Sequence, residues 1–245
     1  MQSKAHYSFS QKMDYFDDDI ELIDVLRDSV LEGDLHDNTT PHILNRVSPS
    51  KHSHLARRKN SKGSRELVMN HLRNTLYSSY VKDIYEELTE YLRNILKHAS
   101  LSGFDSRRLV GEHSFKTEAN HLLSLGSWED VCKYVSDSVF QLLENERSTL
   151  SLLKSMKGKL GLNIEQRVID NALPYLETRH LLVHADGKVN PTFRSKYPNI
   201  PIKGKFVFLD YNFIISMRVA VKELAKAYDK EIIDRNLLNT QHIRK

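Results

Sequence analysis

The chain has few of the residues on which several common protein classes depend. It contains one cysteine in 245 residues, so no disulfide can form within it, and we expect a reducing cytoplasmic location. No apolar run approaches the roughly 20 residues that cross a bilayer. The first residues, Met-Gln-Ser-Lys-Ala-His, lack the apolar core of a signal peptide. We therefore expect neither a membrane protein nor a secreted one.

The balance of charge permits a nucleic-acid partner but does not require one. The 36 Lys and Arg residues exceed the 32 Asp and Glu residues by four, which gives a formal net charge of +4. A hydrophobic content of 40% fits one folded domain with an extension. Cys132, the single cysteine, lies on the apolar stripe of a predicted helix, so we expect a buried structural thiol rather than a nucleophile.

The first 64 residues differ in pattern from the rest of the chain. Residues 17–32 predict a short acidic helix, because three aspartates favour its N-terminus and Gly33 favours its end. Residues 34–64 lose periodicity and contain a basic cluster, which predicts a flexible basic linker: Lys51, Arg57, Arg58, Lys59 and Lys62. We therefore divide the chain into an extension, 1–64, and a helical domain, 65–245.

Apolar residues at helical spacing predict an all-α body, an antiparallel bundle of about four long helices. The first spans about 65–97. The capping box Ser127–Asp130 opens the second, with Trp128 as a core anchor, and a second box at Asn163–Gln166 opens the third. The last helix is capped by Asp210. Residues 100–126 predict an irregular connection with a short helical turn, and residues 205–209 predict a short strand before the last helix.

The third helix carries the residues best suited to chemistry. Arg179, His180 and His184 lie near its end, before an Asp-Gly turn. An arginine keeps its charge and a histidine titrates near neutral pH, so together they suit binding a phosphodiester and moving its proton. His180 and His184 share a helix face, whereas Arg179 and His184 are about 140° apart. The latter two can converge only if the helix unwinds near its end or a second subunit completes the site.

This segment resembles the HEPN (higher eukaryotes and prokaryotes nucleotide-binding) superfamily. Ribonuclease members carry an Arg-x4-6-His motif with a polar residue after the arginine, and Arg179, His180 and His184 match it. The order of residues is most similar to that of the RiboL-PSP-HEPN branch, whose pattern continues here through Val189 and Asn190. Other Arg and His pairs in the chain share the spacing, so the surrounding helix and glycine turn carry the resemblance, which covers roughly residues 65–235.

The resemblance implies metal-independent cleavage of RNA, without a cofactor, at a composite site where two motif helices meet in a homodimer. The 2′-hydroxyl attacks the adjacent phosphorus and leaves a 2′,3′-cyclic phosphate. His184 would act as general acid or base, Arg179 would hold charge developing on phosphate oxygens, and His180 would tune His184 or bind phosphate. Because family members commonly serve as toxins or in antiphage defence, an antitoxin or sensor protein is a further expected partner.

Four basic residues after the motif are expected to contact the RNA backbone: Lys188, Arg194, Lys196 and Lys203. Three other interpretations remain. In a catalytically silent HEPN module, Arg179 and His184 would hold a dimer interface and the protein would be an adaptor or sensor. A zinc site through His180 and His184 lacks the glutamate that follows the first histidine of the commonest metalloprotease motif. A nucleotide binder would lack a glycine-rich phosphate loop.

Overall fold

The computed structural model describes residues 1–32, 48–57, 61–113, 115–145 and 148–244, and helices dominate them. The long helices are α1 (Lys4–Glu32), α3 (Lys62–Leu101), α6 (Trp128–Glu144), α7 (Thr149–Leu160), α8 (Gln166–His184) and α10 (Tyr211–Asp234). The short ones are α2 (Ser53–Ala56), α4 (Ser106–Val110), α5 (Ala119–Ser124), α9 (Pro191–Lys196) and a 3-10 turn at Thr240–His242. Four two-residue strands, β1 (Gln2–Ser3), β2 (Ile202–Lys203), β3 (Phe206–Val207) and β4 (Ile243–Arg244), form two small pairs. The predicted all-α class is confirmed.

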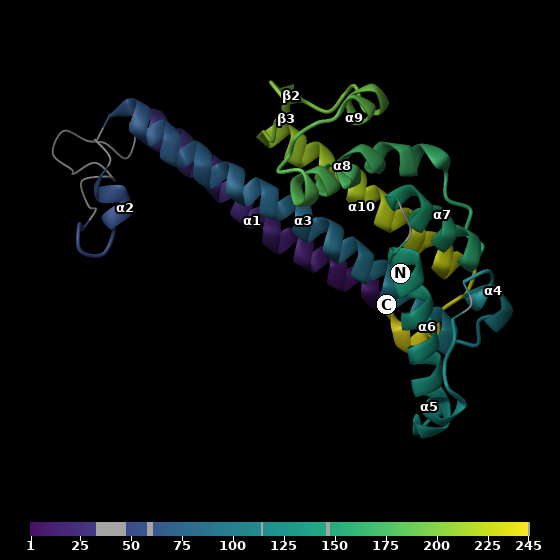
Figure 1. The fold of residues 1–245 in the computed structure, drawn as a ribbon. Helices are drawn as coiled ribbons and strands as arrows, with labels where there is room; N and C mark the ends of the chain where they lie inside the picture. Colours follow the sequence, from purple (N-terminus) through teal and green to yellow (C-terminus); the bar gives the residue numbers. More distant parts are fainter. Residues whose placement is uncertain (33–47, 58–60, 114, 146–147, 245) are drawn as a thin grey trace.

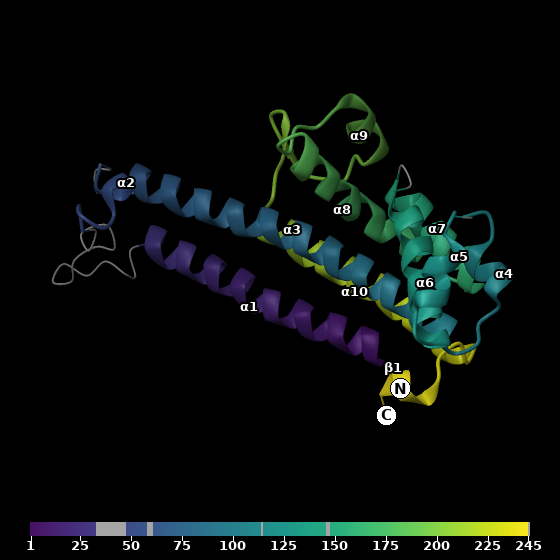
Figure 2. The same ribbon diagram turned by 60° about the horizontal axis from the view of Figure 1, so that its bottom comes forward.

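The two longest helices, α1 and α3, lie side by side and run antiparallel, and their far end extends beyond the rest of the molecule (Figures 1 and 2). The N-terminal helix is much longer than predicted, at 29 residues. Its apolar residues recur at helical spacing and join the main core: Ala5, Phe9, Met13, Ile20, Ile23 and Val30. The prediction of a short helix starting near residue 17 was therefore wrong.

The role of Asp17 in the fold explains why a helix start was wrongly predicted there. Its carboxylate does not cap a helix start but is buried in the middle of α1, where it accepts a hydrogen bond of 2.7 Å from the Tyr80 hydroxyl of α3. Arg218 and Lys222 of α10 contact the same carboxylate at 3.1 and 3.3 Å. Burial and the Asp17 hydrogen bond raise the pKa of Tyr80. The aspartate thus ties three helices together instead of starting one.

The region between α1 and α3 is only partly described. Residues 34–47, Arg58 and Lys59 of the predicted basic linker lie outside the described residues, as does Gly33. Within the described part, α2 is a single helical turn, and α3 begins at Lys62, where the Ser61 side chain accepts a hydrogen bond from the Ser64 amide.

The body is formed by α6, α7, α8 and α10 around the C-terminal half of α3. The last helix, α10, is capped as predicted, because Asp210 Oδ1 accepts a hydrogen bond of 2.8 Å from the Phe213 amide. Two buried tyrosines fix the packing through backbone carbonyls. Tyr91 donates to Ala225 of α10, and Tyr228 of α10 donates to the α7 carbonyl of Leu153.

Two details of the predicted helices are wrong. Ser127 caps α6 as expected, but the Trp128 side chain is 78% exposed and anchors no core. The buried face of α6 begins at Cys132, whose predicted burial is confirmed and raises the pKa of the thiol. The second box does not form, because α8 begins at Gln166 without a side-chain cap. The backbone amide of Asn163 donates instead to the Glu231 carboxylate at 2.6 Å.

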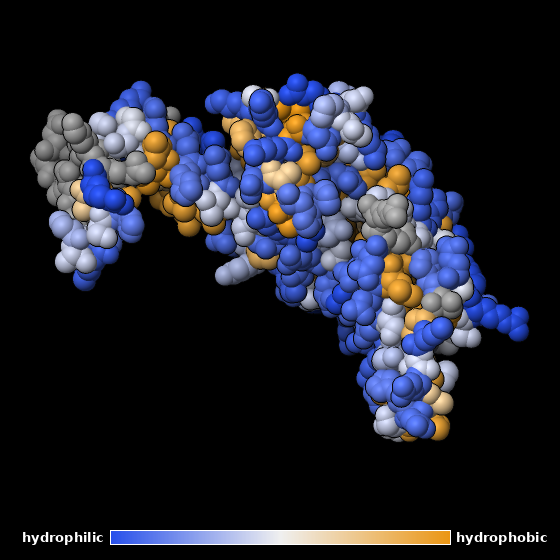
Figure 3. Space-filling model, viewed as in Figure 1, coloured by the Kyte–Doolittle hydropathy of each residue, from blue (hydrophilic) through white to orange (hydrophobic). Residues whose placement is uncertain are grey.

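Two pairs of short strands complete the fold. The β2 and β3 strands form a hairpin where the sequence predicted a strand near 205–209. The β1 and β4 strands bring the two ends of the chain together, as both ribbon views show (Figures 1 and 2). The visible surface is largely hydrophilic, with scattered apolar residues (Figure 3). Among the described residues, no helix combines the length and apolarity that crossing a membrane requires.

Candidate functional site at the end of α8

Helix α8 is held by its apolar face on α3, α7 and α10. Pro174 lies inside it and supplies no backbone N–H. The Thr178 hydroxyl donates to the Pro174 carbonyl at 2.9 Å, and the helix continues regularly to His184. Gly187 then takes a left-handed conformation with φ of 75°, and its amide donates to the Leu181 carbonyl at 2.9 Å. The predicted turn is confirmed, and α8 does not unwind before His184.

Arg179, His180 and His184 line one pocket with a volume of about 330 Å³. Its other walls come from Tyr85 of α3, Glu144 of α6 and the start of α7. The regular helix therefore brings the arginine and both histidines to one pocket within a single chain. Both side chains reach this pocket although α8 stays helical to His184, because the arginine side chain is long. Completion of the site by a second subunit stays a prediction.

Tyr85 positions the arginine. The guanidinium carbon of Arg179 lies 4.7 Å from the centre of the Tyr85 ring, a cation–π arrangement. Its Nε is buried and has no hydrogen-bond partner among the described residues. Because Tyr85 projects from α3 and Arg179 from α8, the packing of these two helices sets where the guanidinium lies. The pocket thus contains a permanent positive charge held by an aromatic ring.

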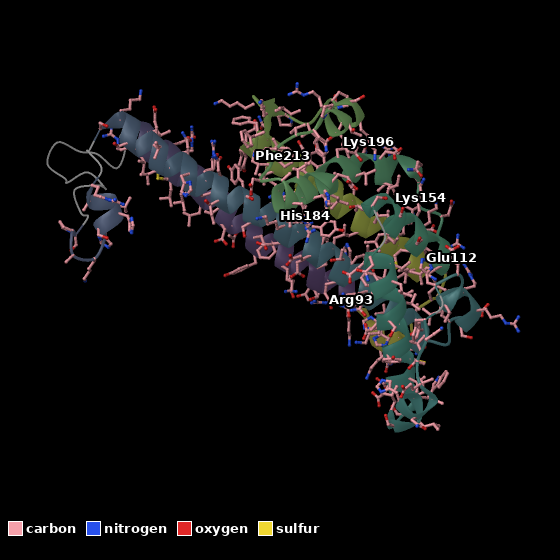
Figure 4. All side chains as sticks on the ribbon, viewed as in Figure 1. Arg93, Glu112, Lys154, His184, Lys196 and Phe213 are labelled. Carbon is pink, nitrogen blue, oxygen red and sulfur yellow. The ribbon has the colours of Figure 1, made fainter. Side chains whose placement is uncertain are left out.

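The two histidines form a pair on the exposed face of α8. Their ring centres are 4.6 Å apart, with an interplanar angle of 48°. Figure 4 shows His184 where the end of α8 passes close to α3. Two carboxylates, Glu144 and Glu177, also line the pocket, and Arg93 pairs with Glu144 at 2.8 Å. The arrangement can hold an anion and exchange protons, although the carboxylates partly offset the positive charge.

The four residues predicted to contact the RNA backbone do not line this pocket. All four are exposed on α9 and around the β2–β3 hairpin. Arg194 donates to the Gly204 carbonyl at 3.3 Å, and the Lys203 ammonium lies 5.6 Å from the Phe208 ring centre. The Lys196 ammonium lies 5.1 Å from the centre of the Tyr197 ring, and the Tyr197 side chain raises the pKa of Lys196. Lys188 lies next to the hairpin, bridged to Phe206.

The described residues contain no group of three or more His, Cys, Asp or Glu side chains that could hold a metal ion. His180 and His184 therefore have no third ligand of these types within the described part of the chain. Zinc binding at this pair would need a ligand from elsewhere.

Sequence reasoning missed most of the pocket wall. Tyr85 packs against the core and also contacts Arg179, and no pattern in the sequence predicts that second contact. Helix α7 was not predicted, so Ser148 and Thr149 at its start could not be assigned to the site. A signal was present, because Ser148 precedes an apolar run and its side chain accepts a hydrogen bond from the Ser151 amide.

No family model, no curated protein and no solved structure matches this chain. The class of the protein is therefore argued from its own residues. The HEPN resemblance rests on the motif around Arg179 and His184 and stays a prediction.

Proposed function

We propose that the protein is a metal-independent endoribonuclease of the HEPN type, and that it cleaves RNA at the α8 pocket. The observation that carries the proposal is the gathering of Arg179, His180 and His184 around one pocket of about 330 Å³. A volume of this size lies at the lower end of the range for ligand pockets, roughly 300–1,000 Å³. The charge and the titrating groups in it suit a phosphodiester.

In the proposed reaction, His184 accepts the proton of the 2′-hydroxyl as its oxygen attacks the adjacent phosphorus. The bond to the 5′-oxygen breaks, and the proton taken by His184 passes to that leaving oxygen. His180, whose ring centre lies 4.6 Å from that of His184, tunes His184 or binds phosphate. The products are a 2′,3′-cyclic phosphate and a 5′-hydroxyl. Arg179 stabilises the charge on the non-bridging oxygens, and one such fixed donor contributes roughly 3 kcal/mol in comparable sites.

The resemblance also supports a homodimer whose two α8 helices face one another. Since one chain already places Arg179 and His184 on one pocket, the second copy would act by enclosing the pocket and adding its own motif to a shared cleft. We further propose that cleavage serves as a toxic activity in cytoplasmic defence, restrained by an antitoxin or sensor protein.

A catalytically silent dimerisation or sensor module is the second candidate, and the pocket gives it a specific basis. Glu144 and Glu177 share the pocket with Arg179, and carboxylates repel phosphate. Arg179 also stacks on Tyr85 with its Nε buried, as a purely structural arginine would. In this candidate, Arg179 and His184 hold a protein interface.

The decisive experiment incubates the full chain with bulk RNA in excess chelator and determines the new ends. We expect 2′,3′-cyclic or 3′ phosphates, and His184→Ala should lower the rate by about 10²- to 10⁴-fold. His71→Ala is the matched control, because Arg65 and His71 share the motif spacing but lie on α3, and neither lines this pocket. Unchanged cleavage by His184→Ala, or cleavage that chelator stops and zinc restores, would overturn the proposal.

A further inference from the structure

A second pocket lies between α4 and α7, with a volume of about 420 Å³. Arg108, Lys154 and Lys159 contribute three basic side chains to its lining, and Glu112 contributes one carboxylate. Figure 4 shows Glu112 and Lys154 on the same side of the molecule and well separated from His184. The α4–α7 pocket is therefore distinct from the α8 pocket and more positively charged.

Lys159 fixes a positive charge in this pocket. Its side chain belongs to a residue only 8% exposed, and its ammonium donates to the carbonyls of Leu109 and Val110 at 2.9 Å each. Both acceptors are backbone carbonyls at the end of α4, so these two bonds set where the ammonium lies relative to the pocket.

Arg108 is also held in place. Its guanidinium lies 5.4 Å from the Phe104 ring centre and rests so closely on Gly161 that a β-carbon there would collide with it. Gly161 has a φ of 66°, which favours glycine independently. Lys154 is exposed on α7, and Gly158 leaves open space on the same helix. Lys159 is thus held by two carbonyls, Arg108 is exposed but packs on Phe104 and Gly161, and the exposed Lys154 can close over a ligand.

We propose that the α4–α7 pocket binds a phosphate group, supplied either by a free nucleotide or by an RNA backbone. An arginine presents a planar fork that matches phosphate oxygens, and lysines add point charges. Both pockets use α7, and their α7 residues are centred about six positions apart, which is about 9 Å along the helix axis. An RNA strand anchored here could therefore continue to the α8 pocket, but phosphate binding does not depend on cleavage there.

The test measures binding by the full chain with three probes: inorganic pyrophosphate, ATP, and a fluorescent 12-nucleotide RNA fully methylated at the 2′-oxygens. The methylated RNA cannot be cleaved by 2′-hydroxyl attack, so the result is independent of the proposed ribonuclease. Lys154→Glu reverses a charge in the pocket. Gly158→Leu fills open space and leaves the charge unchanged. Lys226→Glu is the control, because Lys226 is exposed on α10 and lies in neither pocket.

We expect Lys154→Glu to weaken binding by about tenfold or more and to lower the salt dependence for RNA. Gly158→Leu should weaken binding by occlusion, and Lys226→Glu should leave it nearly unchanged. Loss confined to ATP and pyrophosphate assigns the pocket to a free nucleotide, and loss confined to RNA assigns it to the backbone. Equal affinity of wild type, Lys154→Glu and Gly158→Leu, or an equal loss in Lys226→Glu, would overturn the proposal.

Discussion

Replacing Asp17 with alanine tests whether α1 is an integral part of the folded body. The side chain is 12% exposed, and its carboxylate contacts Tyr80 at 2.7 Å, Arg218 at 3.1 Å and Lys222 at 3.3 Å. Breaking a fully buried ion pair costs about 3–5 kcal/mol. Because the Arg218 and Lys222 side chains are 25% and 35% exposed, water can partly replace the carboxylate. We expect the free energy of unfolding to fall by about 2–3 kcal/mol.

The chain offers a matched control in Asp14→Ala. Asp14 pairs with the same Lys222 at 2.7 Å, but its side chain is 70% exposed, and exposed pairs contribute about 0–1 kcal/mol. Urea unfolding followed by far-ultraviolet circular dichroism measures both variants, and the slope against denaturant should stay unchanged. If Asp17→Ala costs no more than Asp14→Ala, α1 does not pack on α3 and α10 as described, and the reasoning is refuted.

Three further results are expected. Deleting residues 1–60 removes the apolar face of α1 from the core, so the remainder should melt at a lower temperature and bind a hydrophobic dye; a full-length melting temperature would contradict this packing. Mixing Arg179→Ala with His184→Ala protein should restore RNA cleavage if two chains share one cleft, whereas no restoration would place each site within one chain. Burial and the stacked His242 lower the pKa of His98 to about 4; because an unfolded histidine titrates near 6.5, the folded chain binds fewer protons and stability should fall between pH 6.5 and pH 4. The drop in melting temperature over that window should be smaller in His98→Gln, and an equal drop would show that His98 does not contribute.

The helices that could be predicted are those whose own sequence shows which face is buried and where the helix begins. Along α3 and α10 the apolar residues recur at helical spacing, and Asp210 caps α10 in the same way as it would in an isolated helix. Asp17 could not be interpreted in this way, because its partners Arg218 and Lys222 are brought to it only by the tertiary fold. The prediction that Trp128 anchors the core was wrong for a related reason. The spacing of apolar residues identifies one face of α6 but does not show where the helices that cover this face end.

In the candidate site, too, the residues of one helix could be predicted from the sequence and the contacts between helices could not. Arg179, His180 and His184 could be identified because they lie on one short stretch of helix and carry the relevant chemistry. Tyr85 could not, because its contact with Arg179 exists only where α3 and α8 pack together. The missing part of the site is the part that depends on contacts between distant helices.

The pairing of β1 with β4 also bears on the order in which the chain folds. Beside this pairing, the Ser3 backbone amide of β1 donates to the Asp229 carboxylate of α10 at 3.1 Å, across 226 positions of sequence. Closing a loop of that length costs more entropy than forming any local helical turn. The contact can become favourable only after α1 and α10 have docked on α3 and brought the two ends close. We therefore expect the end pairing to form last and to open first, which would appear as faster amide hydrogen exchange at Ser3 than in the middle of α3.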